Sequence, residues 1–216
     1  ADDPVCPASL KGDCFMNRII TVSREFGSGG HTIGKAVAER MGVSFYDSQL
    51  ISKVAKQSGL SEEFIRDNEE YASHANSFLY QIAMSAAGSY GYPSIYQKLY
   101  EAQTHVIEEL AEKEACVIMG RCSDYILRGR TDCLHVFIHA DNAHRAKHVL
   151  ERYGATEKPV EQRLKEMDNR RRNYYRFHTD RDWGVCNNYH LALDSGLLGE
   201  EKCVELILDA ADFKCR

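Results

Sequence analysis

The sequence predicts an α/β fold in which a parallel sheet of about five strands carries helices on both faces. Short runs rich in Val, Ile and Leu recur along the chain, and stretches with helical spacing separate them. Glycine or aspartate follows most of the apolar runs. Such alternation is typical of a parallel sheet, which binds ligands beyond the carboxyl ends of its strands. The expected strands are 18–23, 43–46, 115–119, 134–139 and 189–193.

The first unit of this pattern is the clearest. The run RIITVS at 18–23 indicates a buried strand, and glycines follow it directly. Residues 32–41 have helical spacing, with Ile33 and Val37 on one face, and Gly42 ends the helix. The run VSFY at 43–46 then forms the second strand. Residues 18–47 are therefore expected to be a strand–loop–helix–strand unit.

The middle of the chain follows a different pattern. Residues 48–114 show mainly helical spacing, interrupted by Gly88, Gly91 and Pro93. We expect a helical insertion outside the sheet core, which either covers a substrate or pairs two chains into a homodimer. After the third and fourth strands, a helix is expected near Asn142, a very basic one at 160–175 and a closing one at 200–211.

Composition excludes several classes of protein. A chain of 216 residues fits one α/β domain, and its net charge of −5 argues against a broad nucleic-acid surface. No apolar run approaches the roughly 20 residues that cross a membrane. None of the eight cysteines has Cys-x-x-Cys spacing, so we expect free thiols, no metal-ligating residues and a cytoplasmic protein. Residues 1–15 are expected to be an upstream extension or an expression remnant, and 16–216 a single domain.

A glycine-rich loop separates the first strand from the first helix. Consecutive backbone N–H groups can cradle a phosphate where glycines permit the required dihedral angles, and the following helix adds its free N–H groups. The alternative is a glycine-rich turn with no ligand. The candidate phosphate-binding residues, whose hydroxyls and ring nitrogens can add contacts, are Gly27, Ser28, Gly29, Gly30, His31 and Thr32.

This loop departs from the Walker pattern G-x-x-x-x-G-K-[ST]. When Gly29 is placed at the second glycine, Arg24 takes the position of the first and Gly30 that of the lysine. The lysine normally neutralises the β- and γ-phosphates, so another cation has to replace it. Arg24 is the candidate, because it lies at the mouth of the loop.

The run SREFGSGGHTIGKAVAERMGVSFYD resembles the start of the cytidylate kinase-like proteins, a branch of the P-loop nucleoside monophosphate kinases. The resemblance covers about residues 16–212 and is weakest at 61–104. It implies a P-loop-type sheet with a helical acceptor region and an arginine-rich lid. It also implies transfer of the γ-phosphoryl group of ATP, with Mg²⁺, to a small-molecule nucleotide such as CMP.

The resemblance places the acceptor beyond the second and third strands. The family motif Asp-Ser-Gly followed by arginine corresponds here to Asp47-Ser48-Gln49, with Lys53 at the arginine's place. The alternative for these residues is a helix cap and a surface lysine. The family motif Gly-Arg-Asp corresponds to Gly120 and Arg121, whose guanidinium suits a phosphate.

Cys122 replaces the family aspartate that helps to read cytosine, and Asp124 is the candidate substitute. A thiol cannot contact the amino group of cytosine as a carboxylate does, so the resemblance leaves the acceptor base open.

The basic helix is the expected lid, at about 155–183. The family's lid arginines stabilise charge on the transferring phosphoryl group, and Arg170 and Arg171 are the candidates here. Three consecutive arginines point in different directions on a helix, so at most two can face one ligand. The alternative is a solvated face.

Two other functions remain open. One is a nucleotide-binding regulatory protein without catalysis, which the missing lysine and Cys122 favour. The other is a kinase of a small molecule that is not a nucleotide.

Overall fold

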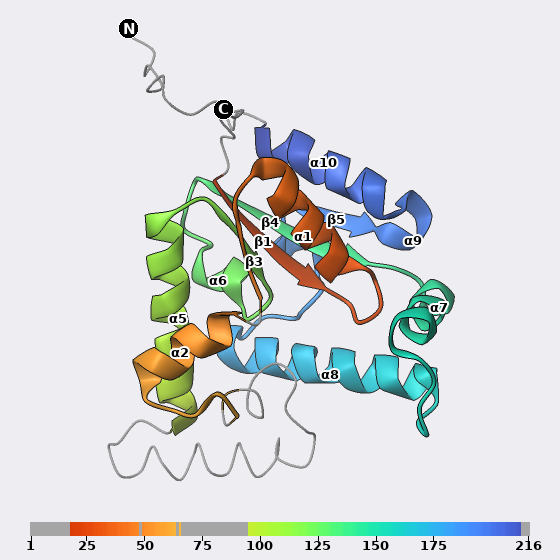
Figure 1. The fold of residues 1–216 in the computed structure, drawn as a ribbon, viewed down its shortest axis with the longest axis horizontal. Coiled ribbons are helices and arrows are strands. Elements are labelled where there is room, and N and C mark those ends of the chain that lie inside the picture. The colour runs from red at the N-terminus through yellow and green to blue at the C-terminus, as the bar shows by residue number, and fades with distance from the viewer. Residues whose placement is uncertain (1–17, 48, 64, 66–94, 213–216) are drawn as a thin grey trace, which may run out of the picture.

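The computed structural model describes residues 18–47, 49–63, 65 and 95–212. Its strands form one five-stranded parallel sheet in the order β2-β3-β1-β4-β5 (Figure 1). This confirms the predicted fold class. The strands are β1 (Ile19–Arg24), β2 (Ser44–Tyr46), β3 (Cys116–Met119), β4 (Cys133–His139) and β5 (Leu191–Asp194).

Helices follow most of the strands, as the sequence pattern indicates. The described helices are α1 (Gly30–Met41), α2 (Gln49–Ser58), α5 (Ile95–Lys113), α6 (Ser123–Ile126), α7 (Asn142–Tyr153), α8 (Val160–Thr179), α9 (Ser195–Leu198), α10 (Glu200–Asp212) and the 3₁₀ turn η3 (Cys186–Asn188). Of the expected helical insertion, α2 and α5 are described, whereas 66–94 lie outside the described residues.

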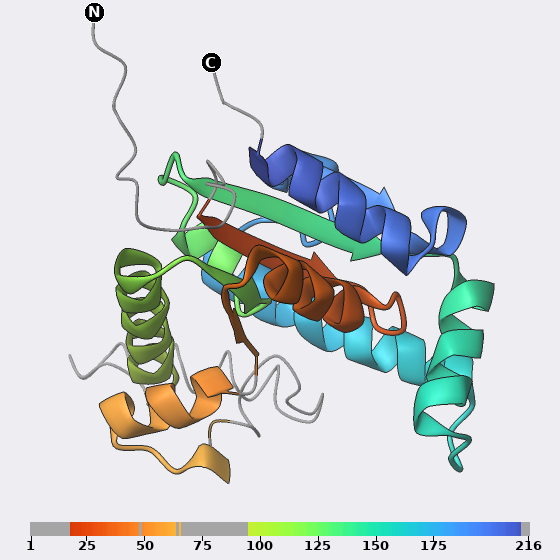
Figure 2. The same ribbon diagram turned by 45° about the horizontal axis from the view of Figure 1, so that its top comes forward.

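Two apolar layers sandwich the sheet, because successive side chains of a strand point to opposite faces. On one face, α1 and α10 lie side by side (Figure 2) and bury Ile33 and Ile207 with Ile20 of β1. On the other face, α2 and α5 bury Val54 and Ile107 with Ile19 of β1. The described helices are too short or too polar to cross a membrane.

The strand order brings several loops to one edge of the sheet. The chain passes from β1 through α1 to β2 on one side, and β4 lies on the other side of β1. In a parallel sheet, a crevice opens where the strand order reverses in this way. The loop after β1, Asp47 after β2 and Arg121 after β3 therefore meet at the carboxyl edge.

The helix α8 runs along this edge, next to α7 (Figure 1). Its side chains reach the loop after β1, since Asp168 accepts from the Phe26 N–H at 2.8 Å and Arg171 Nη1 donates to the Arg24 carbonyl at 2.9 Å. The basic helix therefore forms a wall beside the carboxyl edge of the sheet, and ligands bind at this edge in such folds.

Candidate active site

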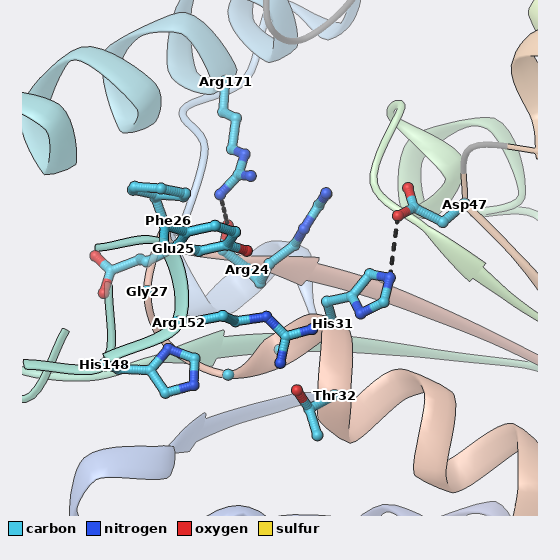
Figure 3. Close-up of a pocket in the computed structure, with 13 residues that line it drawn as sticks. Arg24, Glu25, Phe26, Gly27, His31, Thr32, Asp47, His148, Arg152 and Arg171 are labelled. Carbon is cyan, nitrogen blue, oxygen red and sulfur yellow. Dashed lines mark hydrogen bonds and ion pairs between the residues drawn. The ribbon is translucent and has the colours of Figure 1, made fainter. Parts of the chain in front are cut away.

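A cleft of about 420 Å³ lies between the glycine-rich loop, α7 and α8 (Figure 3). The loop, the start of α1 and the end of β2 form one side, and the two helices form the other. The lining residues are Arg24, Glu25, Phe26, Gly27, Gly29, Gly30, His31, Thr32, Asp47, His148, Arg152, Tyr153 and Arg171. Most of the residues predicted to bind phosphate therefore share one cavity.

The loop places the start of α1 in the lining of the cleft. Gly29 is the N-cap of α1 with a φ of 74°; it has no side chain that could cap the helix, and the Glu200 carboxylate lies against it. The first N–H groups of a helix have no partner within the helix, and the helix dipole makes this end positive. A phosphate in the cleft would meet these groups.

Ser28 faces away from the cleft. Its side chain is buried, and its hydroxyl donates to the Glu25 carbonyl at 2.9 Å and lies 3.2 Å from the Ile138 carbonyl oxygen. In turn, the Ser28 carbonyl accepts from Ser195 Oγ at 2.6 Å. Ser28 therefore shapes the loop, and among the predicted phosphate-binding residues it is the one outside the cleft lining.

The tip of the loop packs directly on α7. A Cβ on Gly27 would lie 2.7 Å from the Arg145 carbonyl oxygen and 2.8 Å from Val149 Cγ2, and its φ is 83°. Both the left-handed backbone and the close approach require glycine at this position. The loop and α7 consequently form one packed unit.

A carboxylate at the end of β2 joins two basic groups. Asp47 Oδ2 lies 3.3 Å from His31 Nε2, and Arg121 Nη1 donates to Asp47 Oδ1 at 3.3 Å (Figure 3 shows the first pair). Burial alone would raise the pKa of Asp47. The hydrogen bond from His31 and the charges of Arg24 and Arg121 outweigh burial and hold the pKa well below its usual range. Asp47 is therefore an ionised oxygen donor between the loop and β3.

Two of the arginines predicted to be catalytic lie in the cleft beside the loop. Arg24, at the end of β1, and Arg171, on α8, are both buried and both line the cleft. Figure 3 shows the Arg24 guanidinium between Arg171 and Asp47. Arg152 adds a third cation to the lining. This concentration of positive charge in an acidic protein suits a polyphosphate ligand.

Arg121 sits in an unusual backbone conformation. Gly120, Arg121 and Cys122 have φ values of 60°, 55° and 56°, so three consecutive residues are left-handed. The buried Gln103 side chain fixes this turn, because its Nε2 donates to the Arg121 carbonyl at 3.0 Å. Tyr174 of α8 donates to Gln103 Oε1 at 3.2 Å. Helix α8 thus contacts the loop through Asp168, and through Tyr174 it contacts Gln103, which holds Arg121.

Other predicted residues lie outside the cleft lining. Arg170 lies 4.0 Å from the Met167 sulfur, and Lys53 is exposed, 5.6 Å from the centroid of the Tyr46 ring. Asp124 is buried and accepts from the Tyr175 hydroxyl at 2.7 Å. Burial raises the pKa of Asp124 to about 6, against the opposing hydrogen bond. Ser48 lies outside the described residues, and Arg121 is buried and is not part of the cleft lining. The roles of all the predicted site residues remain predictions.

Sequence reasoning did not identify the α7 side of the cleft. His148, Arg152 and Tyr153 line it, and Phe26 stacks on Tyr153 with ring centroids 5.8 Å apart. A signal was present in the sequence, since Arg145, His148 and Arg152 recur at helical spacing directly after a strand end.

The sequence of this chain matches a known protein family. The sequence model of the cytidylate kinase-like family matches residues 19–197. A curated cytidylate kinase from Archaeoglobus fulgidus is 31% identical over 202 residues, which cover 90% of this chain and 95% of that protein.

Solved structures agree on the fold. An uncharacterized protein from Eubacterium ventriosum is 27% identical with a TM-score of 0.68, covering 91% of this chain and 99% of its own. A gluconokinase from Sinorhizobium meliloti shares the fold with a TM-score of 0.52 at 18% identity, over 92% of this chain and 93% of its own. The family match and the curated relative support the kinase class. The chain belongs to the cytidylate kinase-like family.

Proposed function

We propose that this protein is a cytoplasmic kinase that transfers the γ-phosphoryl group of ATP to a nucleoside monophosphate, with CMP as the first acceptor to test. The observation that carries the proposal is one cleft in which the start of α1, Arg24, Arg171 and the ionised Asp47 lie together. Phosphoryl transfer depends mainly on positioning and on neutralising charge. The family membership supports the same reaction class.

The donor phosphates would lie on the loop. The backbone from Gly27 to Gly30 and the N–H groups at the start of α1 would hold the β- and γ-phosphates, with Thr32 and His31 contributing polar contacts. Arg24, Arg170 and Arg171 would balance the charge of the transferring group. Ser28 would contribute through the loop's shape, because its hydroxyl is bound to the Glu25 carbonyl.

Magnesium would accompany ATP. Mg²⁺ prefers oxygen ligands and is usually held by one or two protein groups together with substrate phosphates. The Thr32 hydroxyl and the Asp47 carboxylate both line the cleft, and either would supply an oxygen ligand to an ion held mainly by the phosphates; the depressed pKa of Asp47 keeps its oxygens ionised. When bound, the ion would neutralise charge on the phosphates.

The acceptor would lie beyond β2 and β3. The Arg121 guanidinium would bind its phosphate, and Asp47 and Ser48 would contact the nucleotide. Lys53 and Asp124 are weaker candidates on geometry, because Lys53 is exposed and Asp124 already binds Tyr175. A kinase of a small molecule other than a nucleotide would use the same donor loop and differ in this half of the site.

A regulatory nucleotide-binding protein without catalysis is the second candidate, favoured by Gly30 at the lysine position. One assay distinguishes the kinase from the regulatory protein. ADP formation from Mg²⁺-ATP is measured with each of the common nucleoside monophosphates and with a panel of small alcohols. Turnover with a monophosphate supports the proposal. A rise in melting temperature with ATP but no ADP with any acceptor supports the regulatory function instead.

A further inference from the structure

The position of the missing lysine is occupied by another residue's side chain. A Cβ built on Gly30 would lie 2.5 Å from Arg24 Cβ and 3.0 Å from Arg24 Cγ. Real Cβ contacts under 3.0 Å are essentially never observed, and here the obstacle is the rigid base of the arginine side chain. Any side chain on residue 30 is therefore incompatible with the present position of Arg24.

The Arg24 side chain and a lysine on residue 30 would also enter the same part of the cleft. Gly30 is the first residue of α1, and Arg24 is the last residue of β1. From its position across Gly30, the Arg24 side chain extends between Arg171 and Asp47 in the cleft (Figure 3), close enough for its charge to lower the pKa of Asp47. A lysine on residue 30 would start within 3 Å of this path.

We propose that Arg24 and Gly30 are an exchanged pair, in which the strand end supplies the phosphate-binding cation that the helix start supplies in a Walker loop. This inference rests on the proposed function and assigns its central cation. Exchanging the two residue types converts the run R-E-F-G-S-G-G into G-E-F-G-S-G-K, which matches the Walker pattern through its lysine, with His31 still at the Ser/Thr position. Glycine at position 30 is then required mainly by arginine at position 24, because the next atom that a Cβ there would meet, Ile138 Cβ, lies farther away at 3.3 Å.

The exchange can be made in the protein itself. Four variants are compared with the wild type: Arg24→Gly, Gly30→Lys, Arg24→Gly combined with Gly30→Lys, and Arg24→Ala combined with Gly30→Lys. The last is the matched steric control, because alanine keeps the Cβ that lies 2.5 Å from the new side chain. Melting temperature, its shift with inorganic tripolyphosphate, and kcat with Mg²⁺-ATP and CMP are measured for each.

We expect Arg24→Gly to lose kcat by about 10²–10³-fold, as when one preorganised charge-stabilising group is removed, together with the tripolyphosphate shift. Gly30→Lys alone should melt lower and be inactive. The full exchange should melt above both Gly30→Lys and the alanine control. It should also recover at least about tenfold in kcat over Arg24→Gly and regain the tripolyphosphate shift.

Two results would overturn the pair. One is a folded exchange variant no better than Arg24→Gly in both kcat and the tripolyphosphate shift. The other is Gly30→Lys with wild-type stability and turnover. If the wild type itself forms no ADP with any acceptor, the proposed function fails. The melting temperatures and the tripolyphosphate shifts then still decide whether Arg24 and Gly30 exclude each other and share one anion site.

Discussion

Arg145 on α7 and Asp168 on α8 form a buried ion pair, with Nη1 2.5 Å from Oδ2, directly behind the phosphate loop. Both side chains also bind the loop backbone. Asp168 Oδ1 accepts from the Phe26 N–H at 2.8 Å, and Arg145 Nη1 donates to the Phe26 carbonyl at 3.2 Å. The tip of the loop is therefore held by the same two helices that form the far wall of the cleft.

Breaking this pair should destabilise the protein strongly. Asp168→Asn keeps the shape and an oxygen for the Phe26 N–H, but it leaves the buried Arg145 with only the more distant Glu25 carboxylate, 3.6 Å from its Nε. Removal of one partner of a buried ion pair costs about 3–5 kcal/mol. Urea denaturation of the variant and the wild type measures this loss.

The same helix offers a matched control. Arg176 and Asp182 form an exposed ion pair at 3.2 Å. Exposed pairs contribute about 1 kcal/mol or less, so Arg176→Ala should change the free energy of unfolding little. Equal losses in Asp168→Asn and Arg176→Ala would contradict a structural role for the buried pair.

The two lid arginines should differ in their effect on catalysis. Arg171 lines the cleft, whereas Arg170 does not. Arg171→Ala should lower kcat by about 10²-fold or more, in the range seen when a charge-stabilising group is lost, and Arg170→Ala should lower it less. Steady-state kinetics with Mg²⁺-ATP and CMP tests the order. A larger loss in Arg170→Ala would contradict the assignment of Arg171 as the lid arginine that faces the cleft.

Arg121 should set the affinity for the acceptor. Arg121→Ala should raise KM for CMP at least about tenfold, the loss expected from a charge-assisted hydrogen bond to phosphate, and leave KM for ATP close to the wild-type value. Gln103→Leu, which frees the left-handed turn, should act in the same direction with a smaller effect. Thr21→Val removes a buried contact of 2.9 Å to His135 in the sheet and serves as the control. An unchanged KM for CMP in Arg121→Ala would remove Arg121 from the acceptor site.

Asp124 should give stability a pH dependence. Its pKa in the folded protein is raised from 3.8 to about 6, chiefly by burial. The folded state therefore binds the proton more tightly than the unfolded state, and the contribution of Asp124 to stability falls as pH rises from about 4 to about 6. Asp124→Asn should stabilise the protein at pH 8 relative to its effect at pH 4. Urea denaturation at both pH values measures this, and an equal effect at both would contradict it.

Much of this architecture could be predicted from local sequence signals. The five strands, the glycine-rich loop and the stop at Gly42, whose φ is 66°, all follow from short-range patterns. Strand ends differ by one or two residues, as at β5, expected at 189–193 and observed at Leu191–Asp194. Such boundaries depend on which backbone hydrogen bonds the neighbouring strand can form, and a local sequence pattern does not show which strand is the neighbour.

The site itself was harder to predict, because its distinctions depend on tertiary packing. Adjacent arginines on a helix point about 100° apart, and only the docking of α8 places Arg171, not Arg170, on the cleft side. Ser28 carries a hydroxyl of the kind that binds phosphate, but this hydroxyl donates to the Glu25 carbonyl instead. The α7 residues enter the site because Gly27 allows the loop to contact that helix.

Phosphoryl transfer by the purified protein tests the proposed kinase activity directly. With Mg²⁺, γ-labelled ATP and CMP, we expect labelled CDP and an equal amount of unlabelled ADP, and we expect Arg24→Ala to form neither product while it retains the fold. ATP binding without ADP from any nucleoside monophosphate or small alcohol would contradict this activity.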